Sequence, residues 1–186
     1  MARRIAIVII IAFAIFGILA IMYHPAHAAL EPGKKAPLFT AKATLGRHIF
    51  TFDLAQALKK GPVVLYFYPA AFTPGCTAEA HDFADAIGRY KALGATVIGV
   101  SKDDIKKLQA FGTAECRQKF PVASDESLAI ARMYDAVIKF DKDLYANRIS
   151  YVISPGDKIV YAYSSLDPDK HVANTLAALR KLQKKS

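Results

Sequence analysis

Two patterns of apolar residues alternate along the chain. Residues 63–68 (VVLYFY) and 96–101 (TVIGVS) are apolar at nearly every position, which is typical of strands buried on both faces of a sheet. Between them the apolar residues recur every three or four positions, and this spacing predicts a helix over residues 73–93. The residues on its apolar face are Ala80, Phe83, Ile87 and Tyr90.

The remaining segments continue this alternation. Further strands are expected over residues 38–40, 48–50, 149–153 and 158–163, the last two joined by the turn 154–157 (SPGD). Further helices are expected over residues 53–58, from 103 or 104 towards 111, from 124–127 onward with Ser124 as N-cap, and after Pro168. The order predicts one α/β domain, residues 29–186, with a mixed central sheet and helices on both faces.

Residues 1–28 follow a different pattern. Arg3 and Arg4 precede an unbroken apolar run over residues 5–23, and Ala26-x-Ala28 comes soon after. This arrangement predicts an export signal cleaved after Ala28, or an uncleaved membrane anchor, because 19 apolar residues are enough to span a bilayer. Both interpretations place the domain outside the cytoplasm, either in the periplasm or anchored to the inner membrane and facing it, since the arginines hold the start of the chain inside.

Charge and composition narrow the classes of function. The chain carries a formal net charge of +9, but its basic residues are scattered. One small cluster comprises Arg180, Lys181, Lys184 and Lys185, which we interpret as a solvated helix end rather than a site for anionic lipid. No nucleic-acid-binding motif is present, and no glycine-rich phosphate loop or metal-ligand spacing among the five histidines implies a cofactor.

Cys76 lies at the predicted start of the helix that follows the first buried strand. Thr73 suits the N-cap, Pro74 suits the first helical position, and Gly75 permits close approach of the backbone. Free N–H groups and the positive end of the helix dipole would then lie near the Cys76 sulfur and favour its thiolate form. Because sites in α/β folds gather at strand ends, we expect a nucleophilic thiol here rather than an inert buried cysteine.

A family resemblance supports this interpretation. Residues 69–76 (PAAFTPGC) match the Pro-x-x-x-Thr-x-x-Cys motif of peroxiredoxins, and residues 73–80 (TPGCTAEA) resemble the bacterioferritin comigratory protein (PrxQ) branch of that family. The resemblance extends over residues 31–182, with further matching segments at 36–39, 63–68, 97–101, 120–125 and 148–156. It implies a thioredoxin-like fold and a monomer that needs no cofactor.

The resemblance also implies a role for each matching residue. Cys76 would be the peroxidatic cysteine, which attacks the peroxide O–O bond and becomes a sulfenic acid. Thr73 would bind the thiolate and the peroxide through its hydroxyl, and Pro69 would shield the sulfur from water. Arg148 would stabilise the thiolate and the charge that develops on oxygen, and Glu79 would join the hydrogen-bond network.

The recycling step is less well defined by the resemblance. Many members of the branch carry a resolving cysteine five residues after the first, where this chain has His81. That position is about 140° around the helix from Cys76, so we expect His81 to be an exposed or half-buried substitution and not a base. We favour Cys116, late in the next helix, as the resolving cysteine; the alternative is a one-cysteine mechanism with an external thiol. A Cys76–Cys116 bond would require local unwinding.

The sequence therefore predicts a thiol-dependent peroxidase that reduces hydrogen peroxide and organic hydroperoxides and is recycled by a thioredoxin-like reductant. The competing hypotheses are a thioredoxin-fold disulfide-exchange or electron-transfer protein of the cell envelope, and a non-catalytic module. The chain has no Cys-x-x-Cys motif, which argues against disulfide exchange. A non-catalytic module would not explain why Thr73, Cys76 and Arg148 occur together.

Overall fold

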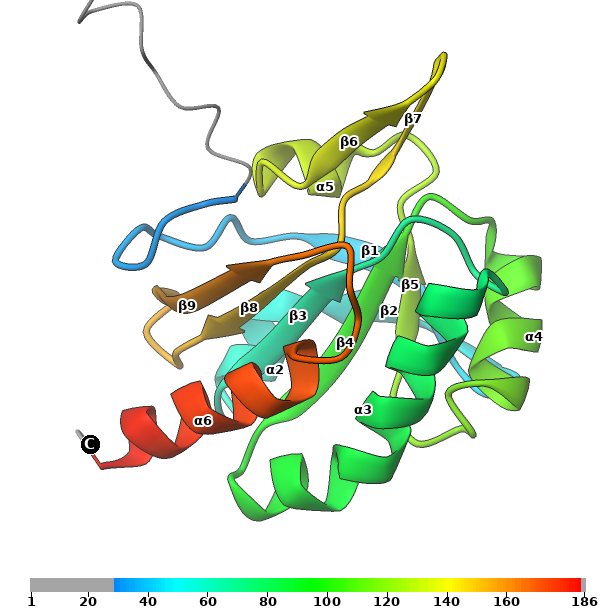
Figure 1. Cartoon of the computed structure of the whole chain (residues 1–186). Coiled ribbons are helices and arrows are strands. Elements are labelled where there is room, and N and C mark those ends of the chain that lie inside the picture. Colours follow the sequence, from blue (N-terminus) through cyan, green and yellow to red (C-terminus); the bar gives the residue numbers. More distant parts are fainter. Residues whose placement is uncertain (1–28, 185–186) are drawn as a thin grey trace, which may run out of the picture.

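The computed structural model describes residues 29–184, in which seven strands form one sheet (Figure 1). The strands are β1 (Thr40–Leu45), β2 (His48–Asp53), β3 (Val63–Phe67), β4 (Thr96–Ser101), β5 (Val122–Ser124), β8 (Ile149–Ile153) and β9 (Ile159–Ser164). They lie in the order β2-β1-β5-β4-β3-β8-β9. The central strands β3, β4 and β5 are parallel, and the outer pairings are antiparallel. The predicted mixed sheet is therefore confirmed.

Helices cover both faces of the sheet, as predicted. They are α2 (Leu54–Leu58), α3 (Pro74–Ala92), α4 (Ile105–Ala114), α5 (Ala129–Met133) and α6 (His171–Gln183). Helices α3, α4 and α6 pack on one face, and α2 and α5 pack on the other. Together the sheet and its helices form the thioredoxin-like arrangement that the family resemblance implied.

The central strand β3 shows why its sequence is apolar at every position. Val63, Leu65 and Phe67 enter the core beneath α2 and α5. Val64 and Tyr66 enter the opposite core, beneath α3, α4 and α6. Each face of β3 is thus buried by a different set of helices, and all five of its residues are inaccessible to solvent. The carboxyl ends of β3 and β4 lie side by side, because these strands pair in parallel register.

The two N-terminal strands differ from the prediction in position. The apolar residues 38–40 were expected to form the first strand, but β1 begins at Thr40. The register is set by a two-residue turn at Gly46 and Arg47, which places Leu45 opposite His48. Gly46 adopts a φ of 57° there, a conformation that glycine tolerates well.

One hairpin was not predicted from the sequence. Strands β6 (Val137–Phe140) and β7 (Asp143–Ala146) form a separate two-stranded sheet. Only one of their eight residues is buried, so the segment lacks the apolar alternation that marks a half-buried strand. Figure 1 shows the hairpin projecting from the end of the main sheet.

Helix α5 starts later than expected. The prediction placed Ser124 at its N-cap, but Ser124 closes β5 and its hydroxyl donates to the Asp103 carbonyl oxygen at 2.7 Å. The N-cap residue is instead Leu128, and the Asp125 carboxylate accepts from the N–H groups of Ile130 and Ala131 in the first turn. In the turn between Asp125 and the start of α5, Leu128 adopts a φ of 59°.

The predicted signal or anchor, residues 1–28, lies outside the described residues. Within residues 29–184, no helix combines the length and the apolar character that crossing a membrane requires.

Candidate active site

Asp103, which follows β4, holds the loop between β3 and α3 in place by a hydrogen bond. The N–H of Ala71 donates to Asp103 Oδ2 at 2.7 Å, and the Ser101 hydroxyl donates to the same oxygen at 2.8 Å. Asp103 Oδ1 also pairs with Lys107 at 2.6 Å. These contacts anchor a loop in which Phe72 adopts a φ of 67°, a strained conformation for an aromatic residue.

Thr73 lies at the N-cap of α3, as predicted, but its side chain does not cap the helix. The hydroxyl instead donates to the Ala70 carbonyl oxygen at 3.0 Å and is exposed. Pro69, half-buried, follows the end of β3 and so terminates the strand as expected.

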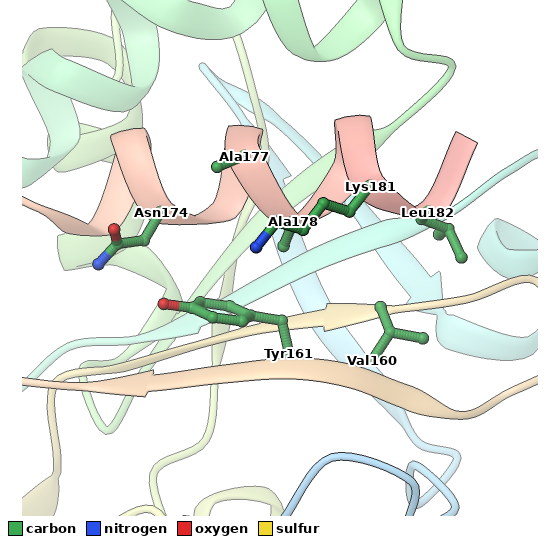
Figure 2. A pocket seen from close by; sticks show the side chains of 7 residues that line it. All are labelled: Val160, Tyr161, Asn174, Ala177, Ala178, Lys181 and Leu182. Carbon is green, nitrogen blue, oxygen red and sulfur yellow. The ribbon is translucent and has the colours of Figure 1, made fainter. Parts of the chain in front are cut away.

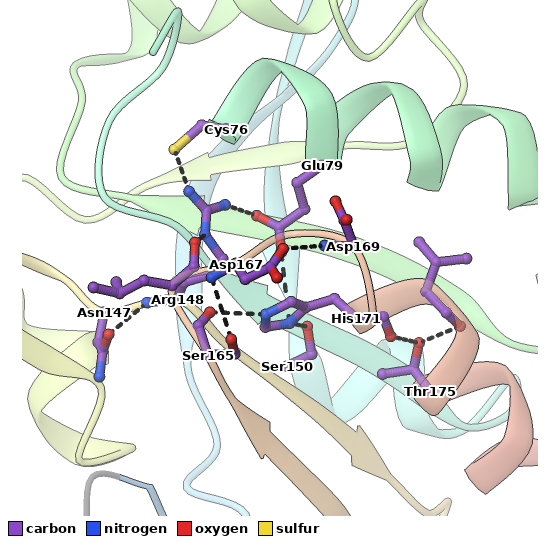
Figure 3. A network of polar contacts seen from close by, with 12 residues as sticks. Cys76, Glu79, Asn147, Arg148, Ser150, Ser165, Asp167, Asp169, His171 and Thr175 are labelled. Carbon is purple, nitrogen blue, oxygen red and sulfur yellow. Dashed lines mark hydrogen bonds and ion pairs between the residues drawn. The ribbon is translucent and has the colours of Figure 1, made fainter. Parts of the chain in front are cut away.

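Cys76 lies in the first turn of α3, and its side chain is 1% exposed. Arg148 Nη2 donates to the Cys76 sulfur at 3.3 Å (Figure 3). Gly75 favours this close approach, because a Cβ there would lie 3.1 Å from the same nitrogen and Arg148 would have to shift. The structure therefore places a fixed positive charge and the N-terminus of a 19-residue helix beside one buried sulfur.

Arg148 is held in place along its whole length. It precedes β8, and its backbone N–H donates to Asn147 Oδ1 at 2.8 Å. Its Nε donates to the Leu166 carbonyl oxygen at 2.9 Å, and Nη1 forms a short ion pair with Glu79 Oε2. The guanidinium thus contacts Cys76 and Glu79, which lie one helical turn apart on α3. The side chain is also held by the backbone at Leu166.

Glu79 is fully buried. Burial raises the pKa of its carboxyl to about 8, although the charge and the hydrogen bond of Arg148 act in the opposite direction. The carboxyl predicted to join the network therefore lies in it, in direct contact with Arg148.

His171 was missed as a site residue. It is the first residue of α6 and fully buried, and its Nδ1 lies 3.6 Å from Glu79 Oε1. The sequence showed a lone histidine before an apolar helix, which gives no signal of a contact with α3. Asp103 was also missed as a site residue. One sequence signal could have found it: it follows β4, and the end of β4 lies beside the loop after β3.

Cys116 occupies a different environment on the same face of the sheet. It lies two residues beyond the end of α4, in a turn rather than late in a helix as predicted. Its side chain is completely buried among apolar residues. Burial, with a smaller contribution from the Glu115 carboxylate, raises the pKa of the Cys116 thiol well above its ordinary value. Both cysteines are free thiols in this structure.

The neighbours of Cys116 on both sides are ion-paired to α3. Glu115 Oε2 lies 2.7 Å from His81 Nε2, and Arg117 Nη1 lies 2.5 Å from Asp85 Oδ1. We call these two pairs the clasp. His81 is half-buried, as expected, and its described partner is Glu115 rather than the Cys76 sulfur.

Within residues 29–184, no group of three or more histidine, cysteine, aspartate or glutamate side chains is arranged to hold a metal ion. The chemistry that the described residues offer is that of a thiol beside an arginine.

Comparison with known proteins defines the class of this thiol protein. The AhpC/TSA family matches residues 32–162. The chain is 36% identical over 157 residues to the chloroplastic peroxiredoxin Q of Triticum aestivum, covering 82% of this chain and 68% of that protein. The crystal structure of the peroxidoxin BcpB from Mycobacterium tuberculosis superimposes with a TM-score of 0.75 at 31% identity, over 82% of this chain and 98% of that one.

A third comparison concerns chemistry. The Xanthomonas campestris bacterioferritin comigratory protein, whose structures address its alkyl peroxide reduction activity, superimposes with a TM-score of 0.68. It is 27% identical, over 77% of this chain and 91% of that one. The chain belongs to the AhpC/TSA family. Its relatives are peroxiredoxins of the Q type, so it is a thiol-dependent peroxidase, and no comparison supports the disulfide-exchange alternative.

Proposed function

We propose that Cys76 is the peroxidatic cysteine of this enzyme and reduces hydrogen peroxide and organic hydroperoxides. The observation that carries the proposal is the 3.3 Å contact between Arg148 Nη2 and the buried Cys76 sulfur. A guanidinium at that distance favours the thiolate, which is the attacking species. Of the two cysteines, only Cys76 has such a partner among the described residues.

In the proposed first step the Cys76 thiolate attacks the nearer peroxide oxygen. The S–O bond forms as the O–O bond breaks, and the departing hydroxide or alkoxide takes up a proton to leave as water or alcohol. Cys76 becomes a sulfenic acid. Arg148 stabilises the charge that develops on oxygen. Thr73 binds the peroxide through the hydroxyl that now donates to Ala70, and Pro69 keeps water from the sulfur.

We propose that Cys116 resolves the sulfenic acid. Its sulfur attacks the Cys76 sulfur, an S–S bond forms, and the S–O bond breaks to release water. Both cysteines belong to the same buried cluster beneath α3, α4 and α6, which favours this pairing. The clasp must open first, together with the first turn of α3, because Cys116 is fully buried behind it. A thioredoxin-like dithiol then reduces the disulfide.

Two single variants test these steps. Cys76→Ser is expected to abolish peroxidase activity, and dimedone is expected to label Cys76 in the parent after mild peroxide treatment. Cys116→Ser is expected to complete one turnover and then stop with thioredoxin as reductant. An unlabelled Cys76 would overturn the assignment of the peroxidatic cysteine. Unchanged steady-state turnover in Cys116→Ser would show a one-cysteine mechanism instead.

We also propose that the domain works outside the cytoplasm, either exported or anchored in the inner membrane. The support is the pattern of residues 1–28, with two arginines, an apolar run and Ala26-x-Ala28. Mass spectrometry of the protein isolated from cell fractions tests this, since a chain beginning at Ala29 in the periplasm is expected from a cleaved signal. Recovery of the full chain from the cytosol would contradict it.

A further inference from the structure

The Arg148 guanidinium donates to two acceptors, and each can be stabilised by its positive charge. Nη2 contacts the Cys76 sulfur, and Nη1 contacts Glu79 Oε2. An ionised Glu79 would neutralise the guanidinium, whereas a protonated Glu79 would leave one net positive charge beside the sulfur. The protonation state of Glu79 therefore sets how strongly Arg148 stabilises the thiolate.

The second oxygen of Glu79 faces His171 (Figure 3). Glu79 Oε1 is buried and has no hydrogen-bond partner among the described residues. His171 Nδ1 lies 3.6 Å from it, a small side-chain movement beyond hydrogen-bond distance. Buried polar atoms are normally paired, so an orphaned oxygen opposite a ring nitrogen requires an explanation.

The hydrogen bonds of His171 fix its tautomer. Nε2 lies 3.0 Å from the Ser165 carbonyl oxygen, which can only accept, so Nε2 carries the hydrogen. Nδ1 lies 2.8 Å from the Ser150 hydroxyl. In the neutral ring Nδ1 is therefore an acceptor and accepts from the Ser150 hydroxyl at this distance, so a hydrogen bond from Glu79 would replace the one from Ser150.

Burial favours the neutral form of both groups. It lowers the pKa of His171 to about 4, with Arg148 acting in the same direction and the Ser165 carbonyl and Asp167 opposing. It raises the pKa of Glu79 to about 8, with Asp82 adding to the effect and Arg148 opposing. Burial thus favours a protonated Glu79 beside a neutral His171, whose Nδ1 is the acceptor that faces the unpaired Glu79 Oε1.

We propose that His171 is a positioning residue that holds a proton on Glu79 Oε1 and so leaves the charge of Arg148 to the Cys76 sulfur. The inference rests on the proposed role of Cys76 and adds a residue from α6 to its control. His171 touches neither the sulfur nor the peroxide in this scheme. It acts through Glu79 and Arg148, which together reach from the start of α6 to the start of α3.

The test measures the Cys76 thiolate directly, without peroxide. In a Cys116→Ser background, iodoacetamide alkylation of Cys76 is followed against pH for the parent and for His171→Gln. A glutamine amide can still donate to the Ser165 carbonyl but offers no acceptor at the Nδ1 position. We expect alkylation at pH 7 to slow about ten-fold and the pH profile to move to higher pH. Superimposable profiles would overturn the proposal.

A second background separates positioning from structural damage. Glu79→Gln mimics the protonated acid, because its amide can accept from Arg148 and donate to His171. In that background His171→Gln is expected to have no further effect on alkylation. An equal loss in both backgrounds would show that His171 is merely structural.

If His171→Gln does not fold, nitrogen NMR of the parent decides. A neutral His171 ring protonated only at Nε2 at pH 7 supports the proposal, and a doubly protonated ring contradicts it. Both measurements report protonation rather than peroxide turnover. A failure of the peroxidatic assignment would instead appear as activity retained in Cys76→Ser, so the two failures are distinguishable.

Discussion

Cys76 and Cys116 are buried to almost the same degree, at 1% and 0% exposure, yet their surroundings are opposite. The Cys76 sulfur lies at a helix N-terminus and 3.3 Å from a guanidinium nitrogen. The Cys116 sulfur lies among apolar side chains, beyond the end of a helix and next to a carboxylate residue. Two thiols buried to the same degree can therefore have charges of opposite sign beside them, and a positive charge favours the thiolate whereas a negative one opposes it.

The largest expected effect comes from removing that charge. Arg148→Met should lower kcat/KM for hydrogen peroxide by about 10²–10³-fold, because a charged donor at the reacting centre is lost. A competition assay against a second peroxidase measures it, and circular dichroism checks the fold. Arg180→Met, on the exposed end of α6, is the matched control and should leave the rate unchanged. A loss of less than ten-fold in Arg148→Met would mean that the helix end alone activates Cys76.

A smaller effect is expected from moving the charge without removing it. Gly75→Ala places a Cβ 3.1 Å from Arg148 Nη2, and the two other contacts of that side chain, with Leu166 and Glu79, limit its retreat. Alkylation of Cys76 should slow about ten-fold, equivalent to ~1.4 kcal/mol less stabilisation of the thiolate.

Gly88 supplies the control on the same helix. A Cβ at Gly88 would have no atom within 4 Å, so Gly88→Ala should raise the stability of the protein by about 0.5–1 kcal/mol without changing the alkylation rate. Thermal unfolding and alkylation are measured on both variants. Equal alkylation rates in the two would refute a role for close approach at Gly75.

The smallest effect concerns Cys116, and it tests what keeps this thiol hidden. Removing the clasp with His81→Ala and Arg117→Ala should speed maleimide labelling of Cys116 about three- to ten-fold, since exposed ion pairs each contribute ~0.2–1 kcal/mol. The measurement uses a Cys76→Ser background, so that Cys116 is the only thiol. Added salt should speed labelling in the parent and have little effect once both pairs are gone.

The exposed pair Lys35–Asp157 is the matched control, because it is remote from Cys116 in the fold. Lys35→Ala should not change the labelling rate. If His81→Ala with Arg117→Ala also leaves the rate unchanged, the apolar packing of Cys116, and not the clasp, holds it in place.

The central elements could be predicted because their sequence patterns have local causes. β3 and β4 are apolar on both faces since helices cover both, and α3 carries a regular apolar stripe. The hairpin β6–β7 could not be predicted, because only one of its eight strand residues is buried and the rest impose no alternation. The start of α5 was placed too early because the Asp125 carboxylate accepts from its first-turn N–H groups five and six positions away, a spacing that ordinary capping motifs lack.

The site divides in the same way. Cys76, Thr73 and Pro69 lie in one continuous motif, and Arg148 was found through family resemblance rather than through any local pattern. His171 and Asp103 act through contacts with segments distant in sequence, which only the folded chain brings together. The capping hydrogen bond expected of Thr73 was wrong, because its hydroxyl turns back to Ala70.

Asp103 ties the start of α4 to the loop that carries Cys76. It fastens the loop that carries Cys76, and it lies two residues before α4, whose other end leads to Cys116. The ten residues of α4 span ~15 Å, and the helix is held by Asp103 near its start and by the clasp and the buried Cys116 beyond its end. In the proposed cycle, opening of the clasp would free the Cys116 end of α4 while Asp103 keeps the loop that carries Cys76 in position.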